Sequence, residues 1–479
     1  MARTQEVVYG VCFVLVSFCA FHVDSLFNVY PRILTRPVEG DPGEPLFLTP
    51  LIEEGRIKEA QRLALVGVGI NEGWTENCHR IKSYSGYLTV NKTFNSNLFF
   101  WFFPAETNSA TAPVILWLQG GPGASSLFGL FTENGPFSIT RRNFLRRRKY
   151  SWTKTHSVIY IDNPVGTGFS FTENDAGYAR NETAVGKDLY NALVQFFTLF
   201  PELQKNDFYV TGESYGGKYV PAVSYTIHTQ NPTAKLQINF KGMAIGNGLS
   251  DPEHMLKYGD YLYQLGLIDS RGRDLFHERE ELGVKYIQEK NWDAAFHVFD
   301  ALLNGDLLST GTLFYNLTGF LNYFNYLSDK PLKYGGDIGE FVQLTKVRRA
   351  IHVGNRTYND GTKVEVFLKE DIMQSVRPWV EQLLGHYRVL IYNGQLDIIV
   401  AYPLTESYLQ VLKWGGAEEY RNATRQKWLV DGEIAGYSKA AGNLTEVLVR
   451  NAGHMVPTDQ PKWAMDLINR FTSGKPFHE

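Results

Sequence analysis

The chain has 479 residues, of which 44% are hydrophobic and 14% aromatic, so it can bury a large core and is not a disordered protein. Its 47 Lys and Arg residues against 50 Asp and Glu give a net charge of −3, which excludes a broad positive field and hence a nucleic-acid partner. A mean hydropathy of −0.23 excludes a protein with many membrane spans.

The N-terminus has the pattern of a secretory signal peptide. A single base, Arg3, precedes the apolar run Val7–Phe21, which is long enough for a signal-peptide core and short for a membrane span of about 20 residues. Small residues allow cleavage after Cys19 or after Ser25, so we expect residues 1–25 to be removed. An uncleaved signal anchor is the alternative. No later segment resembles a span, and no stable membrane span is expected in the mature chain.

The cysteine and glycosylation patterns agree with a secretory route. Two of the three cysteines lie in the signal segment, so the mature chain keeps only Cys78 and cannot form an intramolecular disulfide. A core of this size does not need one, and we assign Cys78 no catalytic role. Six Asn-x-Ser/Thr sequons predict glycosylation. They are Asn91, Asn181, Asn316, Asn355, Asn422 and Asn443.

Apolar runs typical of strands alternate with helical patterns along the chain. A short amphipathic helix is predicted over 52–65, followed by a hairpin around the turn Asn95-Ser96. The hairpin strands are 87–90 and 98–103, and further strands are predicted at 114–118, 158–161, 207–211, 240–245, 389–392 and 447–449. This alternation predicts an α/β fold, with a mostly parallel central sheet and helices on both faces.

Residues 255–346 interrupt the alternation. The segment is rich in aromatic side chains and has a helical pattern, so we expect an inserted helical cap over the carboxyl edge of the sheet. The alternative is that these aromatics only form a helical core. The core of the fold would then consist of residues 26–254 and 347–479.

A catalytic serine is predicted at Ser214. The segment Gly212–Gly216 matches G-x-S-x-G between a predicted strand and a predicted helix, which is the context of the nucleophile elbow in α/β-hydrolases. A serine hydroxyl needs a base. Asp397 and His454 each follow a predicted strand, in the chain order that this fold uses. We therefore predict that His454 takes the serine proton and that Asp397 orients the imidazole and stabilises imidazolium.

A glycine-rich loop follows the predicted strand 114–118. In this fold one oxyanion N–H comes from the residue after the nucleophile, here Tyr215, and the second comes from such a loop. A phosphate loop is excluded because no G-K-[ST] follows and Pro122 lacks a backbone donor. Neither H-E-x-x-H nor C-x-x-C occurs, so we expect no metal site and no cofactor.

Six segments together resemble the serine carboxypeptidases. They are WLQGGPGASSLFGLFTENGP, IDNPVGTGFS, GESYGGKYVP, IGNGLSDPE, YNGQLDIIV and NAGHMVPTDQP. The resemblance extends from about Pro45 to Phe471, and EPLFLTP, VNKTFNSNLFFWFFPA and Gln119 are similar to the vitellogenic-like carboxypeptidases in particular. The resemblance implies an α/β-hydrolase fold and release of the C-terminal residue of a peptide or protein through an acyl-enzyme.

The resemblance also assigns the substrate-binding residues. Gly121 and Tyr215 match the backbone donors to the oxyanion, and Gln119, Glu133 and Glu213 match the groups that hold the free carboxylate of the substrate. Two carboxyl groups repel a carboxylate unless one keeps a proton, so activity should fall as pH rises towards 8. A solvated loop acid at Glu213 and a locally paired acid at Glu133 are the alternatives.

Three positions depart from the family pattern. Gln119 stands where most relatives have Asn; the longer amide shifts the group that holds the substrate carboxylate, so the preferred C-terminal residue does not follow from the resemblance. Ala124 replaces the usual Cys, in agreement with the missing disulfides, and Asn163 stands where Gln is common. None of these changes removes the predicted triad.

Three function classes follow from these residues. The first is the exopeptidase, the second an esterase or acyltransferase on the same triad, and the third a non-catalytic carrier. The carboxylate clamp argues against the second and the intact triad against the third. The signal peptide allows secretion or a lysosomal, endosomal or yolk-body-like compartment, and the resemblance leaves a homodimer open.

A run of basic residues stands apart from these motifs. Its members are Arg141, Arg142, Arg146, Arg147, Arg148 and Lys149. A solvated face is the simplest interpretation of such a run. A proteolytic processing site and a contact with an anionic surface are the alternatives.

Overall fold

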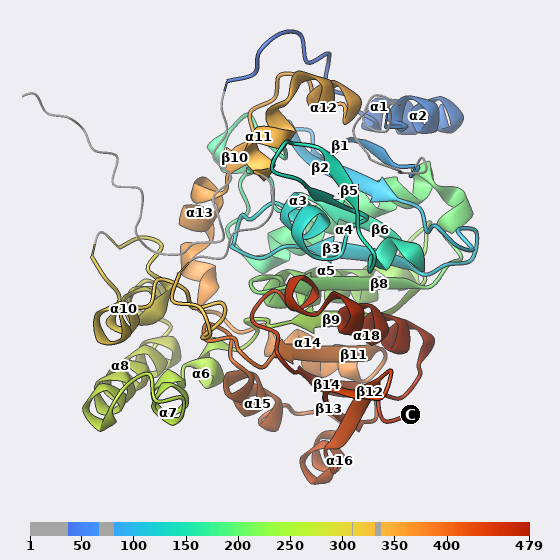
Figure 1. The fold of residues 1–479 in the computed structure, drawn as a ribbon. Coiled ribbons are helices and arrows are strands. Elements are labelled where there is room, and N and C mark those ends of the chain that lie inside the picture. Colours follow the sequence, from blue (N-terminus) through green and yellow to red (C-terminus); the bar gives the residue numbers. More distant parts are fainter. Residues whose placement is uncertain (1–36, 67–80, 309, 331–336) are drawn as a thin grey trace, which may run out of the picture.

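A computed structural model describes residues 37–66, 81–308, 310–330 and 337–479 (Figure 1). The predicted signal peptide and Cys78 lie outside these residues. Among the helices of the described residues, none is both long and apolar enough to cross a membrane.

One ten-stranded sheet runs through the molecule, in the order β1-β2-β6-β3-β8-β9-β11-β14-β13-β12 (Figure 1). Its strands are β1 Tyr84–Asn91, β2 Ser96–Phe103, β3 Val114–Leu118, β6 Ser157–Ile161, β8 Phe208–Glu213, β9 Phe240–Gly246, β11 Arg388–Gly394, β12 Gln426–Val430, β13 Glu433–Ala441 and β14 Leu444–Val449. In the sheet order, the neighbouring strands β6, β3, β8, β9, β11 and β14 pair in parallel. Antiparallel strands extend both edges, β2 and β1 at one and β13 and β12 at the other. The predicted mostly parallel sheet is confirmed.

The central strands form where the sequence is continuously apolar. Every residue of β3 (VILWL) is buried, as a parallel strand covered on both faces requires. Successive residues of a strand point to opposite faces, and β8 shows which helix covers each. Phe208 packs against Phe197 of α4, whereas Tyr209 packs against Phe471 of α18. Helices therefore cover both faces of the sheet.

Eighteen α-helices lie in the described part of the chain. They are α1 Thr49–Glu53, α2 Ile57–Ala64, α3 Ser126–Phe128, α4 Glu182–Leu199, α5 Gly216–Gln230, α6 Pro252–Met255, α7 Tyr258–Gln264, α8 Ser270–Gln288, α9 Trp292–Phe299, α10 Leu313–Thr318, α11 Ile338–Gln343, α12 Thr345–Ala350, α13 Thr362–Ile372, α14 Arg377–Leu384, α15 Tyr402–Gln410, α16 Ala417–Asn422, α17 Val456–Asp459 and α18 Pro461–Ser473. Short pairs β4–β5 (Phe137–Ile139, Leu145–Arg147) and β7–β10 (Thr167–Gly168, Asn359–Asp360) complete the fold.

The described part of the segment predicted as a cap contains the helices α7 to α11 and the start of α12. Helices α7, α8 and α10 form a lobe beside the sheet, while α11 and α12 lie near α1 and α2 (Figure 1). The limits 255–346 of a cap domain stay a prediction. The helix predicted over 52–65 is instead two helices, because Gly55 between them has a φ of 72°, which ends α1.

Candidate active site

Ser214 occupies a sharp turn between β8 and α5. Its φ of 62° is rare for a residue with a side chain, and surrounding hydrogen bonds hold it there. The Ser214 N–H donates to the Gly246 carbonyl at 3.0 Å, and the Ser214 carbonyl accepts from the Leu249 N–H at 3.0 Å. The strained turn presents the Ser214 side chain at the carboxyl edge of the sheet, as the sequence motif predicts.

Asp397 and His454 lie at the same edge, after β11 and β14. The His454 Nδ1 and the Asp397 Oδ2 are 2.7 Å apart, and both side chains are fully buried. Asn247, which follows β9, donates its Nδ2–H to the same Oδ2 at 2.7 Å. Its Oδ1 accepts the Gly394 N–H at 3.0 Å, which fixes the amide orientation. A carboxylate in this position holds the proton of the imidazole on Nδ1 and leaves Nε2 to act as a base.

A loop after α10 supports both of these residues. The His454 N–H donates to the Phe324 carbonyl at 2.7 Å, and the two rings lie 4.9 Å apart. The Tyr323 carbonyl accepts the N–H groups of Ile398 and Ile399, directly after Asp397. Sequence reasoning missed Phe324 and Asn247. Only Asn247 carried a signal, since it follows a predicted strand within the segment IGNGLSDPE.

The glycine-rich loop after β3 lies against the serine turn. A Cβ added to Gly120 would lie 2.5 Å from the Tyr215 backbone nitrogen and 2.6 Å from the Ser214 Cβ, so a side chain is excluded there. Gly121 follows with a φ of 105°. Among the described residues, nothing accepts a hydrogen bond from the N–H of Gly121 or of Tyr215. Both N–H groups are therefore available to an oxygen atom of a ligand.

Gln119, Glu133 and Glu213 come together beside Ser214. Glu213 precedes it on β8, and Glu133 ends the π-helix Gly129–Glu133. The Gln119 Nε2–H₂ donates to an oxygen of Glu133 at 2.9 Å and of Glu213 at 3.2 Å. Trp117 sets this orientation, because its Nε1–H donates to the Gln119 Oε1 at 2.9 Å.

Burial controls the protonation of this cluster. Both glutamates are fully buried, and burial raises the pKa of Glu133 to about 7, against the opposing effect of hydrogen bonds with Glu213 and Gln119. A proton is needed for two carboxyl groups to bond to each other. We therefore expect the pair to hold one proton in mildly acidic solution and to lose it as pH rises through about 7.

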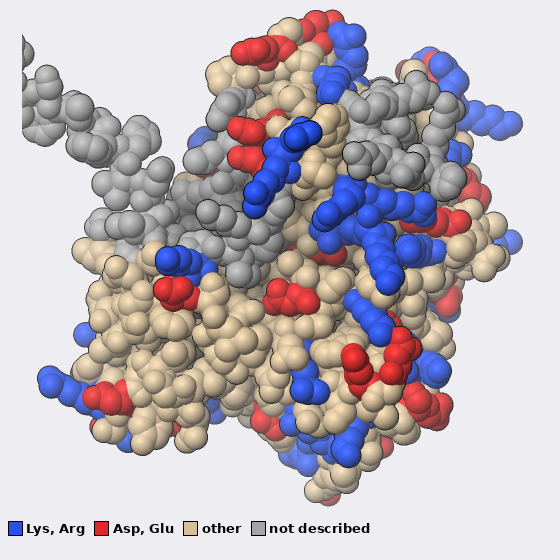
Figure 2. Space-filling view, viewed as in Figure 1, with Lys and Arg blue, Asp and Glu red and all other residues tan. Residues whose placement is uncertain are grey.

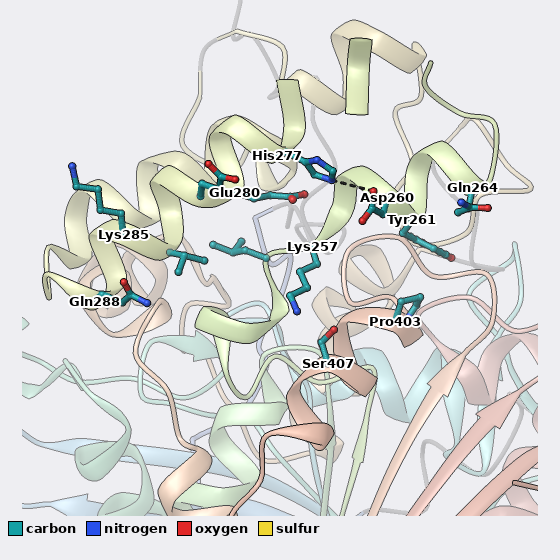
Figure 3. A pocket seen from close by; sticks show the side chains of 13 residues that line it. Lys257, Asp260, Tyr261, Gln264, His277, Glu280, Lys285, Gln288, Pro403 and Ser407 are labelled. Atoms are coloured by element: carbon teal, nitrogen blue, oxygen red, sulfur yellow. Dashed lines mark ion pairs between the residues drawn. The ribbon is translucent and has the colours of Figure 1, made fainter. Parts of the chain in front are cut away.

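Two hollows lie near these residues. A small one, about 40 Å³, opens beside Ser214 and Gly121 and is lined mainly by apolar side chains such as Leu249 and Ile399. A larger one, about 820 Å³, lies between α7, α8 and α15, where His277 pairs with Asp260 at 3.1 Å (Figure 3). None of the residues of the serine site lines the larger hollow, so we give it no role in the chemistry.

One cluster outside the serine site has the composition of a metal site. Ligand atoms of Asp251, Glu253 and His254 lie within 4.8 Å of one another. The Asp251 Oδ2, however, already accepts from His254 at 2.7 Å and from Arg377 at 3.1 Å. Because a guanidinium supplies the positive charge there, this arrangement is explained without an ion.

The predicted glycosylation sites all reach the surface to some degree. Asn181, Asn316, Asn355 and Asn422 are exposed, whereas Asn91 and Asn443 are half-buried. The Asn443 Nδ2, the atom that a glycan would occupy, donates to the Leu384 carbonyl at 2.9 Å. Modification at Asn443 would replace one of the two Nδ2 hydrogens and leave the other for this bond.

Comparisons with known proteins agree with this geometry. The serine carboxypeptidase family profile matches residues 73–474. The chain is 60% identical to the venom serine carboxypeptidase of Apis mellifera (94% of this chain, 96% of that one) and 48% identical to the vitellogenic carboxypeptidase of Aedes aegypti (96% and 98%).

The fold is also that of a solved carboxypeptidase. The crystal structure of Kex1(Δ)p, a prohormone-processing carboxypeptidase from Saccharomyces cerevisiae, matches with a TM-score of 0.71 and 23% identity. The match covers 86% of this chain and 96% of that one, which supports the α/β-hydrolase fold. The chain therefore belongs to the serine carboxypeptidase family and is a hydrolase that acts on peptide bonds.

Proposed function

We propose that this carboxypeptidase removes C-terminal residues through an acyl-enzyme on Ser214, His454 and Asp397, and that it works best at acidic pH. One observation carries the proposal. The buried Gln119–Glu133–Glu213 cluster adjoins the serine, and Glu213 is its immediate neighbour in the chain. A carboxylate bound at this cluster would place the last peptide bond, rather than an internal one, at Ser214.

The reaction would begin with proton transfer. His454 takes the proton of the Ser214 hydroxyl through Nε2, and the oxygen attacks the carbonyl carbon of the last peptide bond. The oxyanion of the tetrahedral intermediate accepts from the N–H groups of Gly121 and Tyr215. His454 then gives the proton to the leaving nitrogen, the C–N bond breaks, and the last amino acid departs. Water attacks the remaining ester by the same steps and frees Ser214.

The cluster of Gln119, Glu133 and Glu213, the carboxylate clamp, would make the rate of this reaction depend on pH. Below the pKa of Glu133, the glutamate pair keeps one proton and can donate a hydrogen bond to the substrate carboxylate. Above it, the pair carries two negative charges, and both repel the carboxylate. The protonated form is therefore fully present in acid and is lost as pH rises through about 7, so activity on free-acid peptides falls in the same range.

We also propose that the protein travels through the secretory pathway as a glycoprotein, to be secreted or delivered to a lysosomal, endosomal or yolk-body-like compartment. The predicted signal peptide and the six sequons support this route. The exposed positions of Asn181, Asn316, Asn355 and Asn422 are compatible with glycans.

Labelling with a serine-reactive phosphonate tests the assignment of the nucleophile. We expect one equivalent of label on the peptide that contains Ser214, because only a base-activated hydroxyl attacks phosphorus readily. Mass spectrometry of digests would locate the label. Ser224, a buried serine of α5, serves as an internal comparison and should carry no label. A protein that takes up no label, or takes it up elsewhere, would favour a carrier role over this mechanism.

A further inference from the structure

The hairpin formed by β4 and β5 takes no part in the proposed reaction, yet it has a well-defined tip. The Thr140 N–H donates to the Phe144 carbonyl at 2.8 Å, and the Phe144 N–H donates to the Thr140 hydroxyl at 3.1 Å. The Asn143 N–H donates to the Thr140 carbonyl at 2.9 Å. These bonds fix the backbone of the tip.

Two of the basic residues of the hairpin already have partners within the molecule. Arg147 forms an ion pair with Glu106. Arg148 points inward, where its Nε–H donates to the Phe137 carbonyl at 3.1 Å, and burial lowers its pKa. These two arginines are explained by the fold alone.

Three other arginines of the hairpin are different. Arg141, Arg142 and Arg146 are exposed, and no carboxylate of the described residues pairs with any of them. Blue side chains gather over the β5 region in Figure 2, so the chain's net charge of −3 conceals a local positive surface. At physiological salt such a surface acts over about 8 Å, which makes it a short-range contact site.

An exposed aromatic side chain lies among these charges. Phe144 at the tip is 41% exposed, between Arg142 and Arg146 in the chain. Guanidinium groups bind anionic headgroups, and an exposed aromatic ring among them can enter the boundary between headgroups and acyl chains. A sulfated glycan would use the charges but would have no use for the ring.

We infer that the β4–β5 hairpin binds the surface of an anionic phospholipid membrane. This inference rests on the charges and the ring of the hairpin, and it does not depend on the proposed function.

Vesicle co-sedimentation tests the inference with the full mature chain. The protein is mixed with vesicles of phosphatidylcholine alone or with phosphatidylserine added, at low and at physiological salt. We expect binding only to the anionic vesicles, weaker at higher salt. Joint replacement of Arg141→Gln, Arg142→Gln and Arg146→Gln should weaken binding about 100-fold, the effect of three basic groups at an anionic surface.

A matched variant controls for net charge. Lys205→Gln, Arg271→Gln and Arg279→Gln remove the same three charges from exposed positions outside the hairpin, and binding should be retained. Hydrolysis of a short soluble peptide, unchanged in both variants, reports that each is folded.

A further single variant separates lipid from glycan. Phe144→Ser should weaken binding to anionic vesicles about tenfold, because the ring loses its apolar contact. Absence of binding to anionic vesicles at low salt would overturn the inference. Equal binding by the two triple variants would also overturn it. So would a protein that binds a sulfated glycan but no vesicles, with the same affinity for the glycan after Phe144→Ser.

Discussion

Asp397→Asn is expected to lower kcat by about 10⁴-fold while the fold stays intact, the factor seen when a triad carboxylate becomes an amide. The Asp397 Oδ2 accepts from both His454 Nδ1 and Asn247 Nδ2, at 2.7 Å each. An amide is neutral and can turn its NH₂ group toward His454, so it no longer holds the imidazole proton on Nδ1 and the imidazole favours the wrong tautomer. The measurement is kcat on a free-acid peptide at pH 5.

Asp300→Asn is the matched control for this variant. Asp300 is equally buried and also accepts hydrogen bonds, but it begins the π-helix Asp300–Asn304 and forms no hydrogen bond with His454. The same isosteric change there should leave kcat within about twofold of the starting enzyme. Near-normal activity of Asp397→Asn would show that another carboxylate orients His454, and the proposed triad would be wrong.

Glu133→Gln is expected to remove most of the decline in activity between pH 6 and pH 8. Glutamine keeps a hydrogen-bond donor beside Glu213 at every pH, so the variant resembles the singly protonated pair permanently. The pKa of Glu133, raised by burial to about 7, sets the range in which the original enzyme loses this donor. The measurement is kcat/KM on one free-acid peptide across that pH range.

Glu133→Ala and Glu280→Gln complete this experiment. The alanine variant loses the donor altogether, and kcat/KM should fall about 100-fold, as for loss of a hydrogen bond to a charged group worth about 2–3 kcal/mol. Glu280 is a buried acid of the helical lobe, and burial raises its pKa as well. Glu280→Gln should therefore show the same decline in activity between pH 6 and pH 8 as the original enzyme. If Glu133→Gln loses activity between pH 6 and pH 8 as steeply as the original enzyme does, another group controls the pH dependence.

The centre of the fold follows from the sequence because burial leaves a clear local pattern. The continuous apolar run of β3 predicts a covered strand, and its observed bounds are the predicted ones. The edge strands β12 and β13 carry no such pattern, since many of their side chains face solvent. They form consecutive hairpins with β14, and their place in the sheet depends on the parallel pairing of β14 with β11, a contact between segments far apart in the chain.

The residues of the candidate active site also differ in how far the sequence predicts them. Ser214, Asp397 and His454 could be placed because Ser214 directly follows β8 and the other two lie a few residues past the ends of β11 and β14, where parallel strands bring distant segments together. Gln119, Glu133 and Glu213 were assigned only through the family resemblance. The contact of Phe324 with His454 depends on how the loop after α10 crosses the sheet edge, and no local pattern encodes that path.

We propose that a free carboxylate on the substrate directs cleavage to the last peptide bond. The most direct test is time-resolved mass spectrometry of matched peptides with free or amidated C-termini, at pH 4.5 and pH 7.5, with Ser214→Ala as the inactive control. We predict stepwise loss of C-terminal residues from the free acids only, faster at pH 4.5 and absent in the control. Equal cleavage of the amidated peptides would contradict the clamp formed by Gln119, Glu133 and Glu213.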